Sequence, residues 1–378
     1  MTTFARMPRS RAAWVVPVVI FGAVVGGGVA LSSASASGDA TLPPKSAAEL
    51  LTAVEGSSAV ALSGTVSETG RFGLPSLPGA DGGASLDWQS LITGAHTALV
   101  SVAGPDKQRV ALLGSLAESD VIRNGQDLWT YTSSTNAVTH TILSGKDGAG
   151  SATGSPDADA SSLTPAGAAQ QALTAIDPST VVTVDPSQVV AGEKAYTLVL
   201  TPRDTRSTVH KVTIAIDATH YVPLQVEVFG ASSTPAFQTG FVGTISFATP
   251  DASVFDFHAP AGATTAPDPL GVNRQHHDHV APNPSGSSSP ATSTPSSSAL
   301  SDVKVIGTGW TSIAELPNGL PAGAMTGLLS KLSTPVGSTG DKIITTSLVN
   351  VLTLSDGRVF VGAVSADLLE QTAAATPR

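Results

Sequence analysis

Apolar and polar residues alternate along much of the chain, which is the pattern of half-buried β-strands. The clearest segment is VIRNGQDLWTYTSSTNAVT, from Val121 to Thr139. Asn124-Gly125 interrupts its alternation, and Asn-Gly between apolar runs predicts a hairpin turn. A polar turn is expected from Ser133 to Asn136. The other strands predicted in this first series are Val60–Val66 and residues 95–102, 109–113, 120–123, 128–131 and 137–143.

A second series of alternating segments lies between residues 180 and 249. Pro223 has no N–H to donate, so its strand is expected to lie at an edge or to contain a bulge there. Strands spaced by about 8–12 residues are typical of an antiparallel sheet that forms a sandwich or curls into a barrel. The apolar positions that alternate along these strands are Tyr196, Leu198 and Leu200; Val212, Ile214 and Ile216; Val222, Leu224, Val226 and Val228; and Phe241, Ile245 and Phe247.

Helices are predicted at few places. Ser46 and Glu49 have the spacing of a capping box at the start of a helix from Ser46 to Glu55. Thr164-Pro165 begins another, whose apolar face makes it a candidate lid over the sheet. Residues 70–92 and 144–162 are interpreted as a long loop and a disordered insertion, because they hold few large apolar side chains. After residue 300 we expect a strand at 303–306, a short helix at 325–332, a hairpin of 343–354 with 358–364, and a helix capped by Ser365.

Composition and the N-terminus indicate export. Three arginines precede the uncharged apolar run Trp14–Leu31, and Ala34-Ser35-Ala36 supplies a cleavage site, so residues 1–36 are interpreted as a signal peptide or an uncleaved membrane anchor. The bulk of the chain is then extracytoplasmic. Without these residues the chain has 16 basic and 29 acidic residues, a net charge of −13, which argues against nucleic acid as a partner. No cysteine is present, which excludes a lipobox and disulfides.

Three segments resemble the LolA/LolB/RseB-like lipoprotein-carrier superfamily. They are residues 121–139, KVTIAIDATHYVPLQVEVFG at 211–230 and GTISFATPDASVFDFHAPAG at 243–262. The resemblance implies an α+β, mainly antiparallel fold: an incomplete, open β-barrel with covering helices and an apolar cavity. It places this barrel at 46–262, a Pro/Ser-rich linker at 263–300 and a small α+β C-terminal domain at 301–372.

Residues for chemistry are scarce. No nucleophile, phosphate-loop or metalloprotease motif is present, so we predict neither an enzyme nor a cofactor. Gln275-His276-His277-Asp278-His279 has metal-binding side chains, but its Pro/Ser surroundings favour a solvated linker. The histidines at 96, 140, 210 and 220 are interpreted as surface or partly buried imidazoles, and Glu118, Asp120 and Asp127 as solvated turn residues. The predicted cavity-lining residues, for which core packing is the alternative, are Trp129, Tyr131, Leu198, Leu224, Val226, Phe241 and Ile245.

Two functions remain open from the sequence. The first is a non-enzymatic exported carrier that shelters the acyl chains of a lipid or an acylated protein in an apolar cavity. The second, by resemblance to RseB-like proteins, is an envelope-sensing regulatory module that binds a membrane protein or another exported protein. The C-terminal part matters most for the second.

Overall fold

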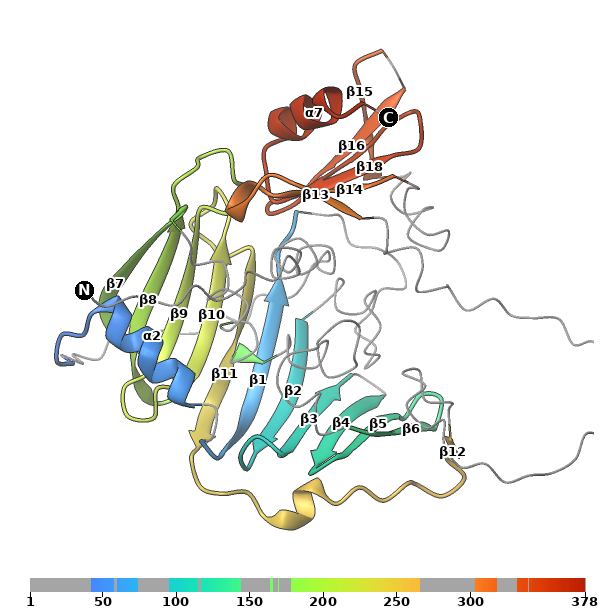
Figure 1. The fold of residues 1–378 in the computed structure, drawn as a ribbon. Coiled ribbons are helices and arrows are strands. Elements are labelled where there is room, and N and C mark those ends of the chain that lie inside the picture. The colour runs from blue at the N-terminus through green and yellow to red at the C-terminus, as the bar shows by residue number, and fades with distance from the viewer. Residues whose placement is uncertain are drawn as a thin grey trace, which may run out of the picture.

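A computed structural model shows the chain as two antiparallel sheets with few helices (Figure 1). The structure describes residues 42–57, 60–73, 95–114, 117–143, 164–165, 169, 178–265, 303–317, 332–338 and 340–377. The predicted export segment, the insertion at 144–162, the histidine-rich tract and most of the loop at 70–92 lie outside these residues. So do the linker beyond residue 265 and nearly all of the helices predicted from Thr164 and from Met325.

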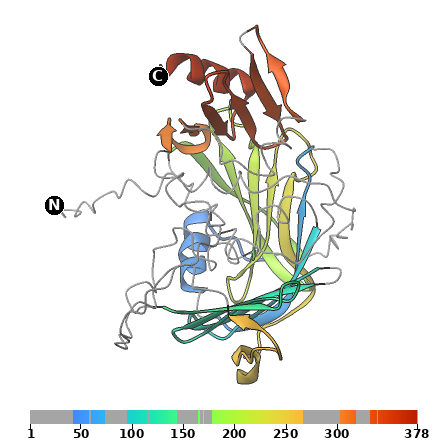
Figure 2. The ribbon, with the colours of Figure 1, turned by 90° about the vertical axis from the view of Figure 1, so that its right-hand side faces the viewer.

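The larger sheet has twelve strands and is open. Its order is β12-β6-β5-β4-β3-β2-β1-β11-β10-β9-β8-β7, so the edge strands β12 and β7 do not pair with each other. All neighbours are antiparallel except β12 and β6. The sheet bends strongly, and the helix α2 (Ala47–Gly56) lies on the inner side of the bend between its two halves (Figure 2). We call this side the concave face. The strands are β1 (Leu62–Gly70), β2 (Ala95–Val102), β3 (Lys107–Leu113), β4 (Glu118–Asn124), β5 (Asp127–Thr132), β6 (Ala137–Ile142), β7 (Thr180–Val190), β8 (Glu193–Pro202), β9 (Lys211–Asp217), β10 (Pro223–Phe229), β11 (Phe237–Ser246) and β12 (Thr264–Thr265).

Local sequence signals account for the turns of the first strand series. β4 and β5 pair through Asn124 and Asp127, so Gly125 and Gln126 form a two-residue loop. Gly125 has a φ of 67° and occupies the first central position, where a glycine fits a type II′ turn. The second predicted turn is also present, because Thr132 pairs with Ala137 across it. Asn136 adopts a φ of 47°, a conformation that asparagine tolerates better than most residues.

The bulge predicted at Pro223 is confirmed, and it changes which residues share a face. The pairing of β9 and β10 shifts between Pro223 and Gln225, so one additional residue lies on β10 there. As a result Leu224 joins a different buried cluster from Val226. The prediction that Val222, Leu224, Val226 and Val228 form one face is therefore wrong at this point, because a bulge interrupts the two-residue period.

α2 (Ala47–Gly56) begins with the predicted capping box. The Ser46 hydroxyl accepts from the Glu49 backbone N–H, and the Glu49 carboxylate accepts from the Ser46 backbone N–H at 2.7 Å. This reciprocal pair satisfies two donors that the helix itself leaves unpaired. Leu50 and Val54 then bury one face of the helix against the large sheet.

The second sheet has six strands in the order β13-β14-β18-β17-β16-β15 and carries the helix α7 (Ala366–Ala375), which Ser365 caps. The single strand predicted at 343–354 is wrong. Thr346 accepts from the backbone N–H of Leu348 and Val349, and this turn divides the segment into β16 and β17. The strands are β13 (Lys304–Ile306), β14 (Ile313–Leu316), β15 (Thr334–Val336), β16 (Asp341–Thr345), β17 (Asn350–Thr353) and β18 (Val359–Gly362), and short 3-10 turns lie at η3 (Ala252–Phe255) and η5 (Gly309–Thr311).

The two sheets share a buried contact. The six-stranded sheet lies at one end of strands β8 to β10 (Figure 1). Trp310 donates from Nε1 to Thr180 Oγ1 at 2.8 Å, and Ser207 pairs with Val364 as an isolated bridge. Trp310 and Leu348 belong to the same hydrophobic cluster as residues of β8 and β9. The C-terminal part is therefore packed against the large sheet through a common core.

Candidate functional site

The concave face of the large sheet is aliphatic across most of its strands. Residues directly opposite each other on antiparallel strands lie on one face, so the register traces this surface. From β7 to β10 the opposite residues are Val184, Leu198, Ile214 and Val226. On β11 the residue opposite Val226 is Thr239, and this row continues through Glu68 on β1 and His96 on β2, so polar residues interrupt it. A second row on the same face, two residues further along β11, runs from β11 to β4 through Phe241, Val66, Ala98, Leu112 and Ser119. These two largely aliphatic rows make the concave face the best candidate surface for an apolar ligand.

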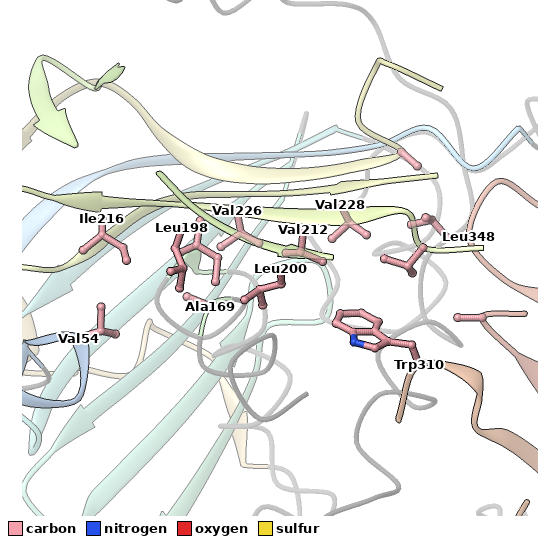
Figure 3. Close-up of a cluster of buried hydrophobic side chains, with 14 of the residues drawn as sticks. Val54, Ala169, Leu198, Leu200, Val212, Ile216, Val226, Val228, Trp310 and Leu348 are labelled. Atoms are coloured by element: carbon pink, nitrogen blue, oxygen red, sulfur yellow. The ribbon is translucent and has the colours of Figure 1, made fainter. Parts of the chain in front are cut away.

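Leu198 and Val226, two of the predicted cavity residues, lie in the first buried cluster. Both are almost fully buried, and they pack with residues of α2 and with Trp310 (Figure 3). Ala169 lies in the same cluster. Here the face is covered by other elements of the chain, so the core alternative describes these two residues.

Leu224, Phe241 and Ile245 lie together in a second buried cluster, which includes Val66 of β1. Phe241 lies directly opposite Val66 across the β1–β11 pair. A Cβ at Gly64 would meet the Phe241 ring at 2.9 Å, so the glycine makes room for this ring. The structure thus brings three of the predicted residues together, beside the middle strands of the sheet.

Trp129 and Tyr131 lie on the opposite, convex face. The prediction that they line the same cavity as the other five residues is therefore wrong. Trp129 lies opposite Ile122 and His140, whereas its neighbour Leu128 packs with Val121 on the concave side. The Trp129 ring stacks on His140 with centroids 3.7 Å apart and on Phe257 at 5.2 Å. Phe257 comes from the segment around η3, which runs beneath this half of the sheet (Figure 2). These aromatics therefore hold that segment against the sheet.

A hollow too narrow to hold a water molecule lies on the concave face between β1, β2 and β3. Its lining residues are Val66, Glu68, His96, Ala98 and Leu112. Glu68 lies directly opposite His96 across the β1–β2 pair, and the two residues are 6 % and 3 % exposed. Burial raises the pKa of the Glu68 carboxyl to about 8. The expectation of a surface or partly buried imidazole at position 96 is wrong, because His96 is buried.

Sequence reasoning missed Glu68, although the sequence carries a signal for it. Leu62, Gly64 and Val66 occupy alternate positions on one face of β1, and Glu68 is the next residue of that series. A carboxyl group at an apolar position of an alternating strand is a buried polar residue, which is an informative observation in itself. None of the seven predicted residues lines the hollow.

The acidic residues near the Asn-Gly turn are not all solvated. Asp120 is buried and accepts from Arg109 Nε and Nη2 at 3.1 and 3.2 Å, in a bidentate ion pair between neighbouring strands. The interpretation of Asp120 as a solvated turn residue is therefore wrong.

Among the described residues, no group of three histidine, cysteine, aspartate or glutamate side chains is placed to hold a metal ion. Within the same ranges, no helix has both the length and the apolar character for a membrane span.

Comparisons with known proteins give structural matches only. No family model matches the sequence, and no curated protein matches it. A chain of the Pseudomonas aeruginosa MucA/MucB complex matches 86 % of this chain and 96 % of its own length, at 16 % identity and a TM-score of 0.43. A crystal structure of MucB matches 87 % of this chain and 96 % of that one, at 15 % identity and a TM-score of 0.38.

A LolA superfamily protein, NE2245 from Nitrosomonas europaea, matches 57 % of this chain and 99 % of its own length, at 13 % identity and a TM-score of 0.24.

Proposed function

We propose that this protein is a non-enzymatic exported carrier that binds the acyl chains of a lipid or an acylated protein on its concave face. The observation that carries the proposal is the pair of largely aliphatic rows on this face, one from Val184 on β7 to Val226 on β10 and one from Phe241 on β11 to Leu112 on β3. Moving hydrocarbon from water onto such a surface is favourable by about 0.8 kcal/mol per methylene. An open sheet, whose edge strands do not pair with each other, leaves a side through which a chain can enter.

Native mass spectrometry of the protein purified from its own host tests this proposal. We expect a population whose extra mass matches an acylated species and that disappears after delipidation. A variant with Ala98→Phe, which adds a bulky ring to the concave face beside Val66 and Leu112, should lose part of this population. The matched control is Leu99→Phe, because Leu99 is the next residue of β2 and lies 46 % exposed on the convex face. Repeatedly empty spectra of the unaltered protein would contradict a carrier.

The second candidate is a regulatory module that binds a membrane or exported protein. The observation that favours it is the six-stranded sheet, which adds a second surface at a fixed place beside the large sheet. Because the two sheets share the core around Trp310, deletion of residues 300–378 would expose that core and disturb both parts. Charge reversal on exposed residues of the second sheet is the sharper test.

Lys342 on β16 is exposed and suits this purpose. If the second sheet binds the partner, Lys342→Glu should weaken capture of a crosslinked partner from the cell envelope while acyl binding persists. Unchanged capture with every such variant would favour the carrier alone. Arg123→Glu on the large sheet serves as the control for a general change in charge.

A further inference from the structure

We propose that the outer edge of β7 binds an extended peptide segment of a partner protein, which adds to the large sheet as a further antiparallel strand. The segment would carry apolar side chains at alternate positions and a basic side chain opposite Asp185. This inference goes beyond the proposed carrier function, because strand pairing at the edge does not require a bound acyl chain. It also names a surface for a protein partner other than the six-stranded sheet.

The length of β7 is the first argument. Figure 1 shows β7 at one end of the large sheet, and among the described strands it pairs only with β8. β7 has 11 residues, whereas the strands at the other three sheet edges, β12, β13 and β15, have two or three. Native proteins usually keep exposed edges short, because unpaired N–H and C=O groups are a template for another strand. Of the described edges, β7 therefore offers the longest template.

The direction of the backbone groups is the second argument. The Arg203 N–H donates to the Ser179 carbonyl at 2.8 Å, in register with the pairing of β7 and β8. Hydrogen-bonded positions alternate along an antiparallel pair. From Ser179 to the bulge in β7, every second residue therefore turns its N–H and C=O toward β8, while Val182 and Val184 turn theirs away. Within the described ranges, no strand pairs with these two donors and two acceptors.

A bulge limits the part of this edge that can pair. The pairing with β8 shifts between Asp185 and Gln188, and Pro186 has no N–H to donate. Bulges and prolines are devices that protect an edge from further pairing. The open part is therefore Val181 to Asp185, which is long enough for a short extended peptide but small for a subunit interface.

The side chains on the concave side of this edge are aliphatic. Val182 and Val184 are half-buried, and with Leu51 of α2 they pack against the first buried cluster. Side chains at alternate positions of an added strand would lie beside these three residues. They should therefore be apolar, because strand addition takes its specificity from such alternate contacts.

Charge decides between a peptide and a second copy of the chain. Asp185 is exposed on the convex side and is the only charged residue from Val181 to Asp185. A lysine or arginine opposite Asp185 would form an ion pair. In a symmetric pair of two β7 strands that joins Val182 of one to Val184 of the other, Asp185 would face Val181 and gain no charged partner. A basic peptide fits this edge better.

Amide hydrogen exchange, measured by NMR on the full-length protein, tests the edge with the synthetic peptide acetyl-Lys-Val-Thr-Val-Thr-amide. In the antiparallel register its lysine lies opposite Asp185 and its valines lie opposite Val184 and Val182. In the free protein we expect the amides of Val182 and Val184 to exchange at least about tenfold faster than that of Thr183. The peptide should slow both amides, with a Kd of about 1 mM or tighter.

Matched controls separate strand pairing from general adhesion. The same peptide with N-methyl groups on both valines lacks two donors and should bind at least about tenfold more weakly. Val184→Pro removes an outward donor without touching the ladder to β8 and should also weaken binding, whereas Val184→Thr keeps the N–H and should bind like the unaltered protein. Asp185→Lys should make a peptide with glutamate in place of lysine the tighter one, by about two- to five-fold. Thermal melting of each variant checks that it folds.

Each other outcome overturns the inference. Slow exchange of Val182 and Val184 in the free monomer would mean that another part of the chain already pairs with this edge. Slow exchange together with a dimer in analytical ultracentrifugation would assign the edge to a second copy. Equal binding of the N-methylated peptide, or no binding at millimolar concentration, would exclude strand addition. None of these results bears on the mass-spectrometric test of the carrier.

Discussion

Two halves of one concave face differ in what covers them. In the half built from β7 to β10, Leu198 and Val226 lie under α2 and beside the second sheet, in a cluster of almost fully buried side chains. In the half built from β1 to β3, the same face contains a hollow with the buried carboxyl of Glu68 in its wall. The first half has the features of a stabilising core, whereas the second places a carboxyl with a raised pKa among apolar side chains. An identical alternation pattern therefore serves stability in one place and, in our proposal, binding in the other.

The largest expected effect concerns Glu68, which lies in the second half. This residue should make the free energy of unfolding depend on pH. Because the folded-state pKa of about 8 lies above the unfolded value near 4.3, the folded state binds more protons between these values. The free energy of unfolding should therefore be highest at low pH with respect to this group and fall as the pH rises toward 8, by about 5 kcal/mol at most. Urea titrations at several pH values measure this slope, and Glu68→Gln should remove it. A slope that survives in Glu68→Gln would assign it to other groups.

The next effect tests the contact between the two sheets. Trp310→Ala should lower the free energy of unfolding by about 3–5 kcal/mol, because it opens a cavity in the shared core and removes the donor to Thr180. Trp310→Phe keeps most of the ring and should cost less. We expect calorimetry of the unaltered protein to show the two sheets unfolding together. Two separate transitions would contradict this expectation. If Trp310→Ala then shifted only the transition of the C-terminal sheet, the common core would contribute little.

A somewhat smaller effect tests whether the covered half is solid core. Leu198→Ala should destabilise the protein by about 3 kcal/mol, since Leu198 is fully buried and touches the cluster under α2. The control Leu99→Ala, at an exposed convex position, should change the stability by less than about 0.5 kcal/mol. Chemical denaturation compares the two. Equal effects would show that the concave face of this half is not tightly filled.

The smallest effect concerns the helix that covers the first half. Ser46→Ala removes the capping box of α2 and should cost about 1 kcal/mol. Thr52→Ala is the control, because Thr52 is exposed in the middle of the same helix. Hydrogen exchange of the α2 backbone, measured beside global stability, should show faster opening of this helix only in Ser46→Ala. Unchanged exchange in that variant would mean that packing of Leu50 and Val54 alone fixes the helix.

Local signals in the sequence predicted much of the fold. The turn at Gly125, the cap at Ser46 and the irregularity at Pro223 follow from backbone chemistry that acts over a few residues, and the structure has all three. The break at Thr346 was missed because a turn made by a threonine side chain leaves no glycine or proline in the sequence. The division of the chain into domains stays a prediction, as does the export segment.

The candidate site was predicted less well, for a physical reason. Alternation shows that Leu128 and Trp129 point to opposite faces, but it does not show which face is concave. That choice depends on segments distant in the sequence, such as the one that brings Phe257 against Trp129. The choice of large aromatic side chains as cavity residues therefore pointed to the wrong face. The informative position was Glu68, an acidic residue within an apolar series.

Photo-crosslinking is the most direct test of the claim that the concave face binds acyl chains. A palmitoyl methyl ester with a diazirine in its chain would be irradiated with the delipidated protein, and the labelled residues would be found by peptide mass spectrometry. The account predicts labels on concave residues around the hollow, such as Val66, Ala98 and Leu112. Labels confined to the exposed convex residues Leu99, Leu113 and Val242, or spread equally over both faces, would contradict it.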